Sequence, residues 1–186
     1  MEKIFEPILD SDEKVIKAFK PHKGKMFTSM MLAWIFSWIW ILFVAFLGIC
    51  TDYEGNFEPS ELWIALLVVG GILVVLLGIT ILFISLVYKN TYYAYTNKRV
   101  IIRKGIFGVD YKSLDLGMIG AVEVNVSLLD KIVHKNTGSI GFGSMASPMG
   151  AANATMFKFA HIQNPYETYK EIKSVVDEFK NKKDSK

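Results

Sequence analysis

The sequence has few of the residues on which catalysis and metal binding depend. Its 186 residues include one cysteine, Cys50, and three histidines. One cysteine allows no disulfide within the chain and no paired-cysteine motif for zinc or redox chemistry. The histidines are far apart and show no spacing typical of metal ligands, and phosphate-binding glycine loops and nucleophile elbows are missing. These absences predict that the protein is not an enzyme and has no cofactor.

Charge is missing from two long stretches. Residues 26–50 and 62–88 contain no Asp, Glu, Lys, Arg or His. About 20 helical residues cross a hydrocarbon core of about 30 Å, so each stretch is long enough to span a membrane. The alternative, a pair of buried core helices in a soluble protein, would require helices far longer than the usual 8 to 20 residues and apolar on every face. We therefore predict a transmembrane helical hairpin over residues 26–88, with an outer loop at 51–61. A channel or transporter is not favoured, because no ionisable residue lines these segments.

Positive charge is also absent from the outer loop, which carries four carboxylates and no Lys or Arg. The cations nearest to the hairpin lie on its other side: Lys20, Lys23, Lys25, Lys89, Lys98 and Arg99. Because Lys and Arg are retained in the cytoplasm, both termini are expected there, facing the anionic leaflet of a plasma membrane. The lysines are dispersed and form no basic stripe with aromatic residues, so no nucleic-acid partner is expected.

The cytoplasmic part after the hairpin, residues 89–186, reads as a small antiparallel β domain closed by one helix. Strand-like runs occur at residues 92–96, 100–104, 109–114, 121–126, 139–142 and 155–159. Asn164 and Pro165 then mark a helix start, and an apolar stripe follows at Tyr169, Ile172, Val176 and Phe179. Residues 1–25 form a separate N-terminal segment, in which residues 13–20 suit a short helix or an extra strand.

Several short motifs in a fixed order resemble one known family. They are residues 95–107, 115–119, 127–132, 137–140 and 164–165. Together they are similar to the bacterial pleckstrin-homology-like domain family, whose members sit directly after membrane helices. The resemblance covers residues 92 to about 180. It implies a seven-stranded, bent antiparallel barrel capped by the C-terminal helix, and a role in binding or scaffolding at a bacterial membrane, with no catalytic residues to carry over.

The resulting functional hypothesis is a membrane-anchored module that recruits a protein partner or contacts lipid at the cytoplasmic surface. The alternative is an architectural or accessory subunit that assembles through its membrane helices with itself or with a larger complex.

The candidate lipid contacts are Lys104, Ile106 and Phe107, in a glycine-flanked turn with an apolar tip. The resemblance suggests an alternative basic hairpin at Lys98, Arg99 and Arg103. A strand of five residues spans about 17 Å, which is longer than a Debye length of about 8 Å. If the first strand runs away from the membrane, the turn at residues 97–99 is a solubilising one and the second turn returns to the headgroups. The opposing interpretation folds Ile106 and Phe107 into the core.

Small residues repeat on both membrane segments. Ser29, Ala33 and Ser37 recur every four residues on the first, and Gly71 and Gly78 share a face of the second. Small side chains allow close approach of helices in lipid. We predict that these faces meet within one chain; the competing use is in a homo-oligomer.

Overall fold

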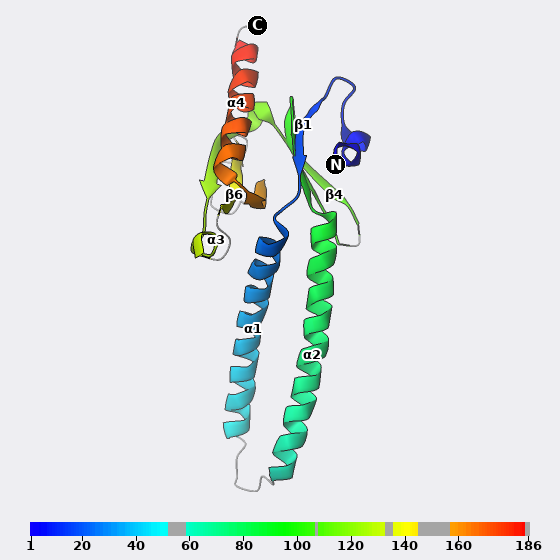
Figure 1. The fold of residues 1–186 in the computed structure, drawn as a ribbon, viewed down its shortest axis with the longest axis vertical. Helices are drawn as coiled ribbons and strands as arrows, with labels where there is room; N and C mark the ends of the chain where they lie inside the picture. Colours follow the sequence, from blue (N-terminus) through cyan, green and yellow to red (C-terminus); the bar gives the residue numbers. More distant parts are fainter. Residues whose placement is uncertain (52–58, 107, 133–135, 145–156, 185–186) are drawn as a thin grey trace. The chain divides into compact units, whose positions relative to one another are not determined.

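The computed structural model describes residues 1–51, 59–106, 108–132, 136–144 and 157–184 (Figure 1). The chain divides into two compact units. The first, here called the β unit, comprises residues 1–26 and 87–186, and the second comprises residues 27–86. The helical hairpin is therefore an insertion within the β unit and does not precede it.

The described residues of the β unit form seven strands. They are β1 (Val15–Phe19), β2 (Tyr92–Thr96), β3 (Arg99–Lys104), β4 (Asp110–Asp115), β5 (Ile119–Asn125), β6 (Thr137–Ser144) and β7 (Lys158–Gln163). Its helices are α3 (Leu128–Ile132), α4 (Pro165–Asp184) and the short 3-10 helices η1 (Glu2–Ile4), η2 (Glu6–Ile8) and η3 (Leu116–Met118). The β2–β7 strands match the six predicted runs, with ends shifted by up to four residues. Residues 155 and 156 of the last run lie outside the described residues.

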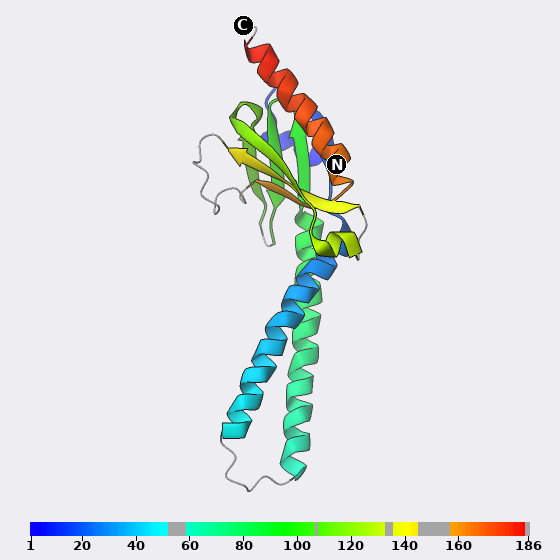
Figure 2. The ribbon, with the colours of Figure 1, turned by 90° about the vertical axis from the view of Figure 1, so that its left-hand side faces the viewer.

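The strands form two antiparallel sheets, with the orders β1-β2-β3-β4 and β5-β6-β7 (Figure 2). The predicted closed barrel is not present among the described residues. The physical reason is that η3 follows β4 directly and turns the chain into the second sheet, so β4 and β5 do not pair.

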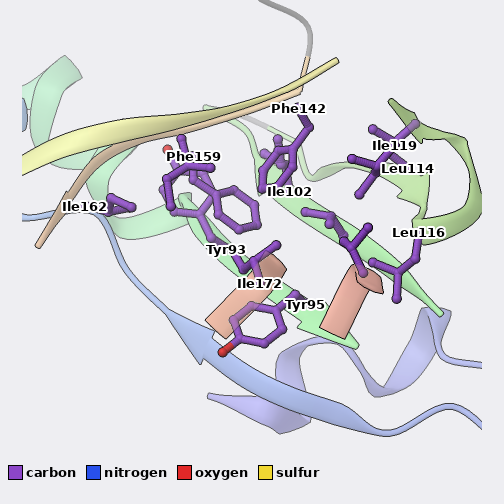
Figure 3. Packing of buried hydrophobic residues seen from close by; sticks show 13 residues of the cluster. Tyr93, Tyr95, Ile102, Leu114, Leu116, Ile119, Phe142, Phe159, Ile162 and Ile172 are labelled. Carbon is purple, nitrogen blue, oxygen red and sulfur yellow. The ribbon is translucent and has the colours of Figure 1, made fainter. Parts of the chain in front are cut away.

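Both sheets and α4 contribute to one core. Figure 3 shows aromatic side chains from different strands meeting at its centre. The ring of Phe159 lies 4.9 Å from the rings of both Tyr93 and Phe142. From α4, Ile172 and Val176 are buried in this cluster, with Tyr169 and Phe179 packed beside them. The apolar stripe predicted for this helix is therefore its packing face.

The N-terminal segment belongs to the β unit, which corrects the prediction of a separate segment 1–25. Of the two alternatives left open for residues 13–20, the strand is correct, because β1 pairs with β2. Phe5 is fully buried against Ala94 and Ile101 on the outer face of the first sheet. The resemblance began at residue 92. It therefore missed strand β1 and the N-terminal residues, among them Phe5, that cover the outer face of the first sheet.

The helices of the hairpin are α1 (Lys23–Thr51) and α2 (Pro59–Asn90). They contain the two predicted stretches and are long and apolar enough to cross a membrane. Within them the hydroxyls of Ser37, Thr80 and Ser85 donate to backbone carbonyls four residues earlier, at 2.8–2.9 Å. In lipid no water is present to accept these hydrogen bonds, so polar groups must find their partners within the protein. The predicted outer loop falls mostly on residues 52–58, outside the described residues.

The glycines of α2 do not form the close contact predicted within the chain. A Cβ added at Gly71 or Gly78 would meet no atom of the described residues within 4 Å. Instead, Trp34 and Trp38 of α1 line one groove with Leu73 and Leu77 of α2. Gly71 lies two residues, or about 200°, from Leu73 around the helix, so it faces away from this groove. The small-residue stripe stays a prediction for association between copies.

Candidate functional site

The end of the first sheet where the chain returns from α2 gathers cations that the sequence disperses. Only Thr91 separates α2 from β2. In the strand register, Tyr92 lies opposite Arg103, and Arg103 opposite Tyr111. Lys20 directly follows β1, and its Nζ lies 4.4 Å from the centroid of the Tyr92 ring. A row of alternating cations and tyrosines therefore crosses the sheet.

Aromatic faces hold the two cations of this row. The Arg103 guanidinium lies 5.3 Å from the Tyr92 ring centroid and 6.0 Å from that of Tyr111, and Lys20 also lies 5.2 Å from the Tyr88 ring. The Nε of Arg103 is buried and has no hydrogen-bond partner within the described parts of the chain. Neither cation pairs with a carboxylate there, so both are available to an anion.

A second cationic group consists of Lys104, Lys112 and Lys158, from β3, β4 and β7. Burial lowers the pKa of Lys104, and repulsion from Lys112 and Lys158 lowers it further. Across the described ranges, no carboxylate forms an ion pair with any of the three. An anion bound among them would relieve this repulsion.

The β3–β4 turn joins the two groups of cations. A Cβ on Gly105 would lie 1.8 Å from the carbonyl oxygen of Gly108, so the tight turn requires glycine there. Asn90, the last residue of α2, donates from Nδ2 to the carbonyl oxygen of Ile106 at 3.3 Å. The turn thus lies beside the end of α2. Ile106 is half-buried, and Phe107 falls outside the described residues. Arg103 and Lys104 are consecutive in β3, so the two groups of cations lie on opposite faces of the first sheet. We call Ile106 and the cations of both groups the basic turn surface: Lys20, Arg103, Lys104, Lys112 and Lys158.

Lys98 and Arg99 lie at the opposite end of β3 from Arg103, so the alternative basic hairpin is not one cluster. Lys98 forms ion pairs with Asp10 and Asp12. Arg99 donates from Nη2 to Glu13 at 2.7 Å, and the Glu13 side chain is fully buried. The prediction that this turn has a solubilising role is wrong for Arg99, because its guanidinium holds the N-terminal segment against the sheet.

The structure thus adds Lys20, Lys112 and Lys158 to the predicted Lys104, Ile106 and Arg103. No local motif marks the added lysines, since strand pairing brings them together. In the part of the chain that the structure describes, no three His, Cys, Asp or Glu residues are placed to hold a metal. The arrangement offers cations and aromatic faces around an apolar turn, which suits binding of anionic groups at an interface.

Comparison with known proteins gives one finding. The family model for the bacterial PH domain matches residues 15–175, which include β1, the hairpin and all later strands. Neither the curated proteins nor the solved structures provide a match.

Proposed function

Because the chain belongs to the bacterial PH domain family, whose model spans most of it, we propose that it is a membrane-anchored binding and scaffold module. In this proposal α1 and α2 cross the bacterial plasma membrane, and both termini are cytoplasmic. The β unit contacts lipid at the inner surface and recruits a protein partner there. Tethering raises the local concentration, so a weak intrinsic affinity is sufficient.

The observation that carries the proposal is the insertion of two membrane-length helices between adjacent strands. Three residues, 20–22, join β1 to α1, and one residue joins α2 to β2. Three extended residues span at most about 11 Å. Both ends of the hairpin are therefore tied closely to one end of the first sheet, and the basic turn surface lies at that same end.

The basic turn surface is the proposed lipid contact. Its cations attract anionic headgroups, each contributing about 1 kcal/mol near a charged leaflet. The half-buried Ile106 adds apolar surface at the tip. Lys98 and Arg99 are satisfied by carboxylates at the far end of β3 and supply no free charge for this purpose.

Spin labels test this assignment. Cysteine is introduced at Ile106 or at Lys98 in the full chain, with Cys50→Ala, in nanodiscs containing anionic lipid. We expect the label at Ile106 to relax with lipid-soluble agents and the label at Lys98 to behave as in water, because a strand of about 17 Å separates the two turns. The reverse pattern moves the lipid contact to the first hairpin and refutes the assignment.

The accessory-subunit alternative places the essential contacts in the helices. A chimera separates the two functions. Residues 27–86 are replaced by an unrelated two-helix hairpin of the same length, and bound proteins are captured from mild detergent. A recruiting module retains the partner that the native chain captures, whereas an accessory subunit loses it. Deletion of residues 1–90 is unsuitable, because it removes β1 and the buried Phe5.

A further inference from the structure

The short helix α3 exposes two large apolar side chains. Leu128 is 75% exposed and Ile132 is 74% exposed. Residues four apart lie on the same face of a helix, so the two form one small apolar patch. Lys131, beside them, is also exposed. The remaining charged residue of α3, Asp130, is buried. The helix thus presents apolar and cationic groups to the outside and its one carboxylate to the inside.

Asp130 holds α3 in this orientation. Its carboxylate accepts hydrogen bonds from Thr137 Oγ1 at 2.7 Å and from the backbone N–H of Ser127 at 2.9 Å. It also forms an ion pair with Lys25 Nζ at 2.9 Å. The bonds to Thr137 and Lys25 tie Asp130 to β6 and to the start of α1, so α3 cannot turn to bury Leu128 and Ile132 without breaking them.

The position of Lys25 indicates what covers the patch. Lys25 lies in the first turn of α1, and Met26 directly after it begins the uncharged stretch. The ion pair therefore fixes α3 beside the residue at which the chain enters its apolar segment. Figures 1 and 2 show α3, the end of β3 and the start of β4 at the same end of the β unit, opposite the C-terminal end of α4.

We propose that α3 is a second membrane contact, in which Leu128 and Ile132 insert at the headgroup level of an anionic bilayer and Lys131 pairs with lipid phosphate. The occupant is lipid because the exposed charge is cationic and the patch adjoins the start of a membrane-length helix. The inference rests on the proposed function. Together, α3 and the β3–β4 turn give the β unit two separate contacts with the membrane. Each contact restricts rotation of the unit about the other.

The test uses the full chain with Cys50→Ala in nanodiscs of neutral and anionic lipid. A fluorophore is attached to a cysteine at Leu128, and in a second variant at Ile132. The matched control is Met118, an exposed apolar residue of η3 (49% exposed) at the far end of the first sheet. A label at Val75 of α2 reports insertion of the hairpin. Quenching by lipid-attached doxyl groups and by aqueous iodide is measured for each label.

We expect the labels at Leu128 and Ile132 to lie about 5–10 Å into the interfacial region. They should be quenched by doxyl lipid and protected from iodide, while the label at Met118 is quenched by iodide alone. Iodide quenching at residues 128 and 132, with doxyl quenching at Val75, overturns this inference and leaves the proposed function standing. Protection from both quenchers assigns α3 to a contact between copies and also overturns it. If the Val75 label is quenched by iodide alone, the hairpin is not inserted in the bilayer, and the proposed function itself is refuted.

Discussion

Lys25→Met is expected to destabilise the β unit by about 3–5 kcal/mol, because it leaves the buried Asp130 carboxylate without its cation. Each side chain of this pair is only 6% exposed. Ser127 and Thr137 still donate to the carboxylate, but neither carries a charge. Urea unfolding in detergent, read by pulse proteolysis, measures the change.

Two variants control this experiment. Lys23→Met, which removes an exposed cation in the same helical turn, should change stability by less than about 0.5 kcal/mol. Lys25→Met combined with Asp130→Asn should recover much of the loss, since no buried charge is left unpaired. Equal effects of Lys25→Met and Lys23→Met would show that the ion pair contributes nothing.

The same pair has a predictable pH dependence. Burial by itself raises the pKa of Asp130, but hydrogen bonds from Ser127, Lys25 and Thr137 outweigh it and hold the pKa below its usual value. A carboxylate with a depressed folded pKa stabilises the fold fully above its unfolded pKa, about 3.9. The contribution disappears as the pH falls through the lower folded value. The free energy of unfolding of the native chain should therefore exceed that of the double variant at neutral pH, and the difference should be lost only below about pH 4.

Arg99→Ala is the second substitution with a large expected effect. It removes the guanidinium that donates to Glu13 from Nε at 3.0 Å and from Nη2 at 2.7 Å. Among the described residues, Thr96 Oγ1, at 2.6 Å, and the backbone N–H of Asp10 remain as donors to this buried carboxylate. We expect a loss of about 3–5 kcal/mol. Hydrogen exchange should show faster exchange in β1 than in β7, because the N-terminal segment is released first.

The neighbouring Lys98 provides the matched control. It pairs with Asp10 and Asp12 at the surface, where ion pairs contribute little. Lys98→Ala should therefore leave the unfolding midpoint nearly unchanged. Arg99→Lys should give an intermediate loss, because an ammonium cannot reproduce the fork of two hydrogen bonds. A similar response to Lys98→Ala and Arg99→Ala would mean that burial of Glu13 does not matter to stability.

Sequence reasoning missed both ion pairs because each joins residues far apart in the chain. The donor atoms of Arg99 meet Glu13 across 86 positions. A signal for the second pair does exist in the sequence. Asp130 lies within an apolar segment, and Lys25 directly precedes another. A charged side chain that is buried together with such a segment needs a partner. Which residue serves as the partner still depends on how the N-terminal residues fold with the rest of the β unit.

The local features of this protein follow from its sequence alone. Hydrophobic length predicts α1 and α2, residue alternation predicts β5, and the start signals at Asn164 and Pro165 with the following apolar stripe predict α4. Each of these depends on neighbours within a few residues, and local propensity and periodicity report on such neighbours directly.

Tertiary structure alone decided the membership of β1 in the first sheet and the assembly of the basic turn surface. The segment 15–19 is short and shows no clear alternation of burial, so its pairing with β2 is set by contacts formed after the hairpin has been synthesised. Lys20 follows β1, Arg103 lies in β3 and Lys158 lies in β7, and only strand register and sheet packing bring them to one end of the unit. Non-local pairing of this kind leaves no period in the sequence, because the residues that stabilise it lie on the far side of an insertion of about 70 residues.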